Sequence, residues 1–174
     1  MADFISVEIK GADALVQQLG LALRRLEQPR DLMQALGNVL RVNIERRFDT
    51  KTDPTGARWA PWRPATVEKY NRADTQRKGK RAGQVVKRGT LLERTGQMRN
   101  SLAVNAGDSQ VQVGMNRLTD GGKWSIPLLH EFGTTRMTRR GIFLADPEAG
   151  TLGAGDEADL NIELVEFLDK VFGD

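Results

Sequence analysis

The side chains that most enzymes use for nucleophilic or metal-assisted catalysis are scarce in this chain of 174 residues. It contains no cysteine, and His130 is its one histidine. Without cysteine there is no thiolate nucleophile, no disulfide and no thiolate zinc site. His130 would have to serve any serine nucleophile, but no serine lies in the Gly-x-Ser-x-Gly pattern of a nucleophile elbow. We therefore expect His130 to be a structural histidine.

Pairs of carboxylates and glycine-rich turns are the remaining candidates for chemistry. Glu163 with Glu166, or Asp156 with Asp159, could in principle hold a divalent cation or act as acid and base. They are more simply explained as the solvated face and the first turn of an acidic helix. The segment 79–81 lacks the upstream glycine and the downstream Ser or Thr of a phosphate-binding loop. We expect no catalytic residue, no cofactor and no metal, so the protein is not predicted to be an enzyme.

A net charge of +3 conceals a strong separation of charge along the chain. Residues 63–99 hold 11 Lys or Arg and 3 acids, a balance of +8, whereas residues 146–174 hold 9 acids and one lysine, a balance of −8. Such asymmetry indicates electrostatic interaction with a partner or with another copy. Residues 71–89 have almost no apolar content and are expected to form a long flexible basic loop. Its cations are Arg72, Arg77, Lys78, Lys80, Arg81, Lys87 and Arg88.

The basic loop has two interpretations. It could order on an acidic protein surface, or it could neutralise the phosphates of a nucleic acid without regard to sequence. Tyr70 is the one aromatic residue near these cations, so the base-stacking platforms of single-strand binders are missing. The acidic region of the same chain favours the protein surface.

The hydrophobic pattern predicts a single α+β domain over residues 1–174, with helices packed on a small, mostly antiparallel sheet. Alternating apolar residues predict a strand at 4–10, a hairpin at 102–104 and 111–114, and a last strand at 142–144. Helical spacing predicts helices at 12–27, at 31–48 and at 156–172, the last being an acidic C-terminal helix. Shorter helices are expected at 64–70 and from Ile126. No apolar stretch reaches the ~20 residues of a membrane-spanning helix, so we expect a soluble, intracellular protein.

Three short motifs occur along the chain in a recognisable order. The first is Pro54-x-Gly56-x-x-Trp59-x-Pro61-Trp62, and the second is Arg94-Thr95-Gly96-x-x-Arg99-x-Ser101. The third is His130-Glu131-Phe132-Gly133. In this order and spacing, from about residue 12 to residue 144, the chain resembles the phage virion morphogenesis, or tail completion, family of contractile-tailed phages such as Mu and P2.

The resemblance implies a non-enzymatic assembly protein that completes the tail and joins it to the head, at the head-proximal end of the tail or at the neck. Its partners would be the tail tube, the tail terminator or the neck and connector proteins. It would act as a homo-oligomer, in a ring such as a hexamer, because head-to-tail contacts close into rings. It would work in the host cytoplasm during assembly and then in the virion. The alternative function is sequence-independent nucleic-acid binding by the basic loop.

Each motif residue also has a purely structural interpretation. Trp59 and Trp62 could fold their loop back on the core, because tryptophans are often largely buried. Arg94 and Arg99 could pair with acids of the same subunit as easily as with a neighbour. Gly96 and Gly133 are most simply positions that need unusual backbone angles. The interaction residues predicted from the motifs are Pro54, Gly56, Trp59, Pro61, Trp62, Arg94, Thr95, Gly96, Arg99, Ser101, His130, Phe132 and Gly133.

Overall fold

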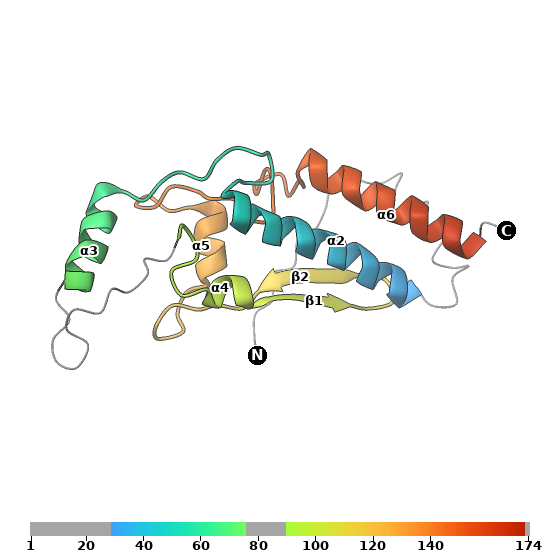
Figure 1. The fold of residues 1–174 in the computed structure, drawn as a ribbon. Helices are drawn as coiled ribbons and strands as arrows, with labels where there is room; N and C mark the ends of the chain where they lie inside the picture. Colours follow the sequence, from blue (N-terminus) through green and yellow to red (C-terminus); the bar gives the residue numbers. More distant parts are fainter. Residues whose placement is uncertain (1–28, 76–89, 173–174) are drawn as a thin grey trace.

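A computed structural model describes residues 29–75 and 90–172 and shows an elongated molecule in which helices pack on a two-stranded antiparallel sheet (Figure 1). The α+β prediction is therefore confirmed. Among the described helices, none has the length and apolar character needed to cross a bilayer. In chain order the elements are α2 (Pro29–Thr50), α3 (Pro64–Thr75), α4 (Gln97–Asn100), β1 (Leu102–Ala106), β2 (Val111–Met115), α5 (Ile126–Phe132) and α6 (Ala154–Phe172).

The hairpin β1–β2 forms where alternating apolar residues flank a polar turn. Val104 lies opposite Val113 and Ala106 opposite Val111, so these side chains share one face of the sheet. The backbone N–H of Gly107 donates to the carbonyl of Gln110 at 2.8 Å and closes the turn. The predicted hairpin is confirmed, and each strand is longer than its apolar pattern indicated.

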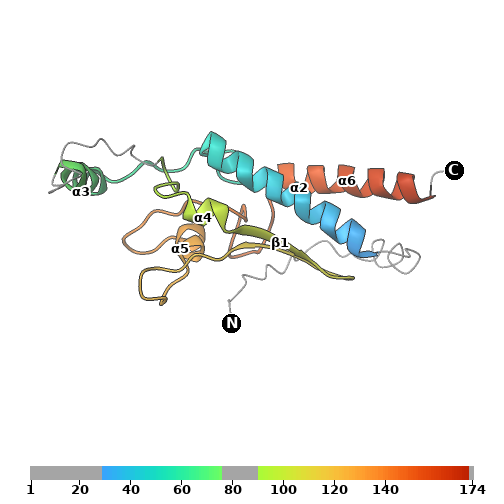
Figure 2. The same ribbon diagram turned by 60° about the horizontal axis from the view of Figure 1, so that its bottom comes forward.

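Helix α2 lies across the apolar face of the hairpin, at a distance that a glycine permits (Figure 2). A Cβ at Gly37 would clash with Val104 Cγ1 and would lie 2.6 Å from Val111 Cγ2. Gly37 is therefore the point of closest approach between α2 and the sheet, although glycine inside a helix costs about 1 kcal/mol relative to alanine.

Gly37→Ala is expected to lower the free energy of unfolding by up to about 2 kcal/mol, even though alanine favours the helix. Overpacking a filled core costs about 1–3 kcal/mol, which exceeds the gain of about 1 kcal/mol in helix propensity. Urea denaturation followed by circular dichroism measures the change. The matched control is Gly155→Ala in α6, where an added Cβ meets nothing within 4 Å. If Gly37→Ala stabilises the protein as much as the control does, this view of the contact is wrong.

Helix α6 packs on the other side of α2 from the hairpin (Figure 1). Leu32 and Met33 of α2 are buried with Leu164 of α6 and Ala106 of β1. A second buried cluster surrounds Phe48 at the end of α2; its other buried members are Ile44, Trp59, Met98, Met115, Ile142, Phe143 and Leu144. The core therefore follows α2 along its length.

The start of α6 is tied to α2 by a buried polar network. The guanidinium of Arg47 pairs with both carboxylate oxygens of Asp156, and its Nη1 donates to the carbonyl of Ile142 at 2.9 Å. Asn43 Nδ2 donates to Asp156 Oδ1 at 3.1 Å and to Asp159 Oδ2 at 2.8 Å. The carboxylates Asp156 and Asp159 thus hold two helices together, and the interpretation of this pair as a merely solvated first turn is wrong.

The predicted strand at 142–144 is wrong, because these residues form no ladder in the part of the chain that the structure describes. Their backbone N–H groups instead donate to one side chain. Glu131 Oε2 accepts from Ile142 at 2.6 Å and from Phe143 at 2.9 Å, and Oε1 accepts from Leu144 at 3.1 Å. A buried carboxylate therefore takes the place of a strand partner.

Several boundaries also differ from their predictions. Helix α3 continues to Thr75, five residues beyond the expected end at Tyr70, because no glycine or proline interrupts 71–75. Arg72 therefore belongs to a helix and not to the start of the predicted loop. Helix α2 begins at Pro29 and α6 at Ala154, two residues before each expected start. The remaining loop cations at 76–89, the strand at 4–10 and the helix at 12–27 lie outside the described residues.

Candidate functional site

The loop after α2 begins with a tight turn around Asp53. Asp53 Oδ1 accepts from the backbone N–H groups of Thr55 at 2.8 Å and Ala57 at 3.0 Å. Gly56 has φ 85°, a left-handed angle that glycine adopts at little cost. Pro54 is buried against Gly153, where a Cβ would collide with the Pro54 carbonyl. Pro54 and Gly56 therefore fix the loop to the segment before α6.

Trp59 is part of the core, whereas Trp62 faces a cleft. The Trp59 ring meets Phe48 edge to face, with centroids 5.4 Å apart, and its Nε1 donates to the Gly141 carbonyl at 2.9 Å. Trp62 is half-buried. The guanidinium of Arg140 donates to the carbonyls of Ala60 and Pro61 at 2.8 and 3.0 Å, which fixes the backbone between the two tryptophans.

Arg99 is held inside its own subunit. It donates to Asp49 Oδ1 at 2.7 Å and to Glu93 Oε1 at 2.9 Å, and it lies 5.9 Å from the centre of the Phe48 ring. Hydrogen bonds to Asp49 and Glu93 raise the pKa of Arg99. Burial raises the pKa of Glu93, but hydrogen bonds from Lys51, Arg99 and Thr90 outweigh it and lower that pKa overall. Arg99 is thus explained as a structural cation.

The rest of the second motif shapes the turn into α4. Gly96 has φ 72° and directly precedes the helix, and the Ser101 hydroxyl closes it by donating to the Met98 carbonyl at 2.7 Å. Thr95 Oγ1 accepts from the Gln97 N–H at 3.5 Å. These contacts position the segment 94–98 so that its residues line the cleft.

The third motif surrounds the buried carboxylate that orders 142–144. Helix α5 carries Pro127 in its first turn and ends at Phe132, and the following Gly133 has φ 72°. A Cβ at Gly133 would lie 2.9 Å from the Arg139 nitrogen, so the chain passes closely over this residue. Arg139 in turn donates to the Glu131 carbonyl at 2.9 Å. Phe132 is exposed, whereas Glu131 is buried.

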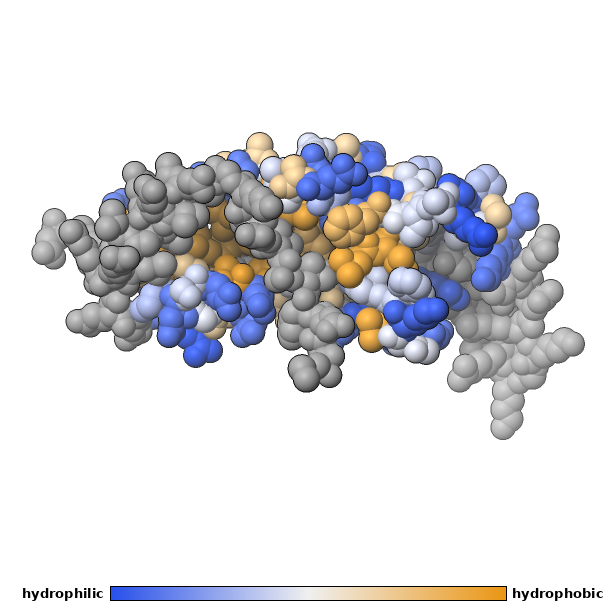
Figure 3. Space-filling model, turned by 180° about the vertical axis from the view of Figure 1, so that it is seen from behind, coloured by the Kyte–Doolittle hydropathy of each residue, from blue (hydrophilic) through white to orange (hydrophobic). Residues whose placement is uncertain are grey.

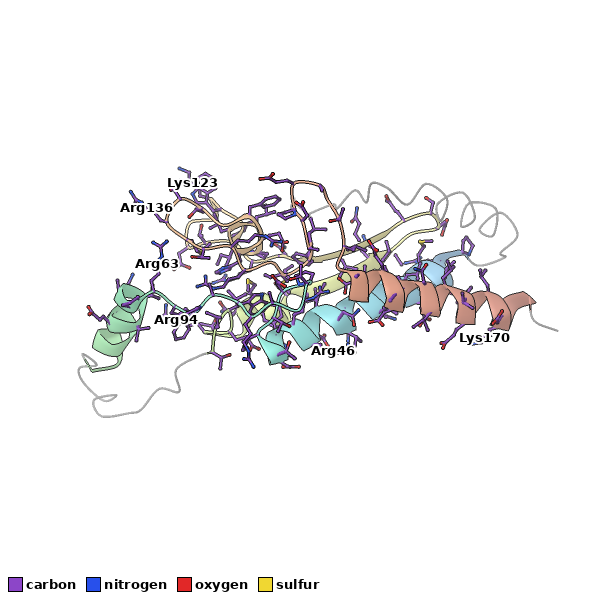
Figure 4. All side chains as sticks on the ribbon, turned by 90° about the horizontal axis from the view of Figure 1, so that it is seen from above. Arg46, Arg63, Arg94, Lys123, Arg136 and Lys170 are labelled. Carbon is purple, nitrogen blue, oxygen red and sulfur yellow. The ribbon has the colours of Figure 1, made fainter. Side chains whose placement is uncertain are left out.

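The segments that carry the motifs meet at a cleft of about 710 Å³. We call it the arginine cleft, because Arg63, Arg94, Arg117, Arg136 and Arg140 line it. Among the described residues that line it, Asp120 alone is acidic, and it lies 4.0 Å from Arg117, a surface pair of little energetic value. Arg63, Arg94, Arg136 and Lys123 gather at one end of the molecule, far from Lys170 on α6 (Figure 4).

Burial and neighbouring positive charge lower the pKa of two groups in the arginine cleft, Arg140 and His130. Burial and then the charge of Arg63 lower the pKa of Arg140. Burial and then the charge of Arg140 lower the pKa of His130 to about 4. His130 Nδ1 is buried and has no hydrogen-bond partner among the described residues. The imidazole is therefore neutral at pH 7, and the arginines give the cleft an affinity for anionic groups.

Large apolar side chains are exposed on the elements around the cleft. Trp124 and Phe132 are each more than half exposed, and Leu118 is 42% exposed. Lys123 lies 5.4 Å from the centre of the Trp124 ring. Seen from behind, hydrophobic side chains reach the surface among hydrophilic ones in the half of the molecule that holds α5 (Figure 3). We call Arg63, Leu118, Lys123, Trp124 and Arg136 the cleft rim, whereas Phe132 lies on the side of α5 away from Ile126 and His130, which line the cleft.

Five predicted residues line the arginine cleft, namely Trp62, Arg94, Thr95, Gly96 and His130. The others position the loops around it or lie elsewhere on the surface. Sequence analysis missed Glu131, although a lone carboxylate inside a short apolar helix was a usable signal. It also missed Arg63, Arg117, Arg136 and Arg140, because they are scattered along the chain.

Comparison with known proteins gives one family. The model of the phage virion morphogenesis family matches residues 9–163, which is most of the chain. No curated protein and no solved structure gives a significant match. The matched region contains all three motifs and every residue of the arginine cleft.

Proposed function

Because the chain belongs to the phage virion morphogenesis family, and so acts in virion assembly, we propose that it completes the tail and joins it to the head. It works at the head-proximal end of the tail or at the neck, as an oligomer and without catalysing a reaction. Assembly takes place in the host cytoplasm, and the protein becomes part of the virion. Its partners are the tail tube, the tail terminator or the neck and connector proteins.

The observation that carries this proposal is the arginine cleft itself. Segments of all three family motifs meet there, and the described residues that line the cleft include five arginines and one acid. Guanidinium groups bind carboxylates in two-pronged, oriented pairs, which suits docking onto an acidic protein surface. The exposed Trp124 on the cleft rim adds a type of side chain that often dominates binding energy at protein interfaces.

A complementation experiment tests the proposal. In a phage or prophage that lacks this gene, the wild-type chain is expected to restore tailed heads, counted by electron microscopy. The variant Arg63→Glu with Arg136→Glu should give at least about tenfold fewer joined particles, because reversed rim charges oppose docking. Both side chains are exposed, and no carboxylate of the described residues pairs with either. Folding should therefore be unchanged, as circular dichroism and thermal melting can verify.

The matched control reverses the same number of charges away from the cleft. Arg30 and Arg46 are exposed residues of α2, and Figure 4 places Arg46 far from the cleft arginines. Arg30→Glu with Arg46→Glu should join heads and tails as wild type does. The proposal fails if the gene deletion leaves joined particles at the wild-type number. Its mechanism fails if the cleft variant complements as well as the control.

Nucleic-acid binding remains the second candidate, because the same five arginines could contact phosphates. A titration of duplex DNA across salt concentration separates the two functions. Phosphate contact requires log affinity to fall linearly and steeply with log salt. We expect no such dependence on the cleft arginines. A steep slope that Arg63→Glu with Arg136→Glu reduces would favour nucleic acid.

A further inference from the structure

The outward side of α6 combines apolar side chains with unpaired acids. Ile162 and Val165 are each more than half exposed, at the centre of the solvent-facing side of the helix. Glu166 and Asp169 are exposed beside them, and no cation of residues 29–75 and 90–172 pairs with these two. We call Ile162, Val165, Glu166 and Asp169 the acidic face. Because a surface helix normally buries its apolar residues, this face has the composition of an interface.

The cleft rim also combines exposed apolar side chains with charged ones, but its charges are positive. Leu118 and Trp124 form its apolar part, and the cations Arg63, Lys123 and Arg136 lie at the same end of the molecule. No carboxylate of the described segments pairs with these three cations. The rim and the acidic face thus match in both respects that govern interfaces: apolar centres and complementary charges.

The two surfaces are too far apart to meet within one subunit. The cleft and its cations lie at the end of the molecule that carries α3, whereas α6 runs towards the opposite end (Figures 1 and 4). If the two surfaces bind each other, the contact must therefore join two copies.

We infer that the acidic face of one copy docks on the cleft rim and arginine cleft of the next, in a head-to-tail contact. This inference rests on the proposed assembly function and names the surfaces by which the chain would form its oligomer. Because two different patches meet, each copy can bind one neighbour through its acidic face and another through its cleft rim. Successive copies therefore either close into a ring or continue as a filament. The acidic face argues for a protein occupant, since nucleic acid would be repelled by it.

Two half-interface variants test the contact. The rim variant carries Trp124→Ala and Arg136→Gln, and the face variant carries Val165→Ala and Glu166→Gln. All four side chains are exposed, so both proteins should fold. In sedimentation velocity the wild type should self-associate as concentration rises, and added salt should weaken this. Each variant alone should show at least about tenfold weaker self-association.

Mixing the two variants tests most directly whether the two surfaces bind each other. The intact acidic face of the rim variant can still bind the intact rim of the face variant, so the mixture should form dimers that grow no further. Arg30→Gln with Arg41→Gln, at two exposed cations of α2 outside the acidic face and the cleft rim, is the matched control and should behave as wild type. A wild type that stays monomeric up to about 1 mM, or a mixture that forms no dimer, would overturn the inference. If that happens while the gene deletion still blocks joining, the inference fails and the proposed function stands.

Discussion

Glu131→Gln is expected to lower the free energy of unfolding by about 3 kcal/mol. The carboxylate accepts three backbone N–H groups from residues 142–144 and is buried. Glutamine keeps the size but offers one acceptor oxygen and turns an NH₂ group towards donors. A hydrogen bond to a charged group contributes about 1.5–3 kcal/mol, and a buried donor left unpaired costs about 1–3 kcal/mol. Guanidinium denaturation at pH 7 measures the loss.

Hydrogen exchange gives a second, local measurement on the same variant. The amides of Ile142, Phe143 and Leu144 should exchange faster in Glu131→Gln, because they lose acceptors, while those of the β1–β2 hairpin should keep their protection relative to global stability. Glu148→Gln, at an exposed glutamate, is the matched control and should change neither quantity. A Glu131→Gln protein within about 0.5 kcal/mol of wild type would show that this carboxylate does not anchor the segment.

Acidification is expected to destabilise the protein through His130, by about 2 kcal/mol between pH 7.5 and pH 5. Its pKa in the folded chain is about 4, whereas the ordinary value is 6.5. Between these values the unfolded chain binds a proton that the folded chain excludes. Stability is therefore highest above pH 6.5 and is lost as pH falls towards about 4. Denaturation midpoints measured across this range test the sign as well as the size.

His130→Gln isolates this effect, because the chain has no other histidine. The variant should lose about 2 kcal/mol less than wild type over the same pH interval, although its stability at pH 7.5 can differ. Carboxylates such as Glu93 contribute equally to both proteins. Parallel pH profiles for the variant and the wild type would contradict the assignment.

Elements whose pattern is local could be predicted from the sequence. The hairpin follows from alternating apolar residues on either side of the polar turn at 107–110, and α6 follows from apolar residues at helical spacing. The conformation of 142–144 could not be predicted, because three consecutive apolar residues are as compatible with a strand as with the irregular buried segment that forms. Its conformation depends on Glu131, whose carboxylate reaches it only in the folded chain. Periodicity carries no information about such a contact.

The candidate site was predictable as a set of motifs but not in its division of roles. Trp59 and Trp62 lie three residues apart in one loop, yet the first is buried on Phe48 and the second lines the cleft. Arg94 and Arg99 divide in the same way between the cleft and an internal pair with Asp49. These differences depend on which side of the loop faces the core, which residue type and spacing do not specify.

Electron cryo-microscopy of tails and joined particles from a phage that encodes this chain tests the central claim most directly. The account predicts density for this fold in a ring at the head-proximal end of the tail, with the arginine cleft facing an acidic surface of a neighbouring subunit. Free tails from the cleft variant Arg63→Glu with Arg136→Glu should lack that ring. Density for the fold at the distal end of the tail, or none at the head-proximal end of free or joined tails, would contradict the account.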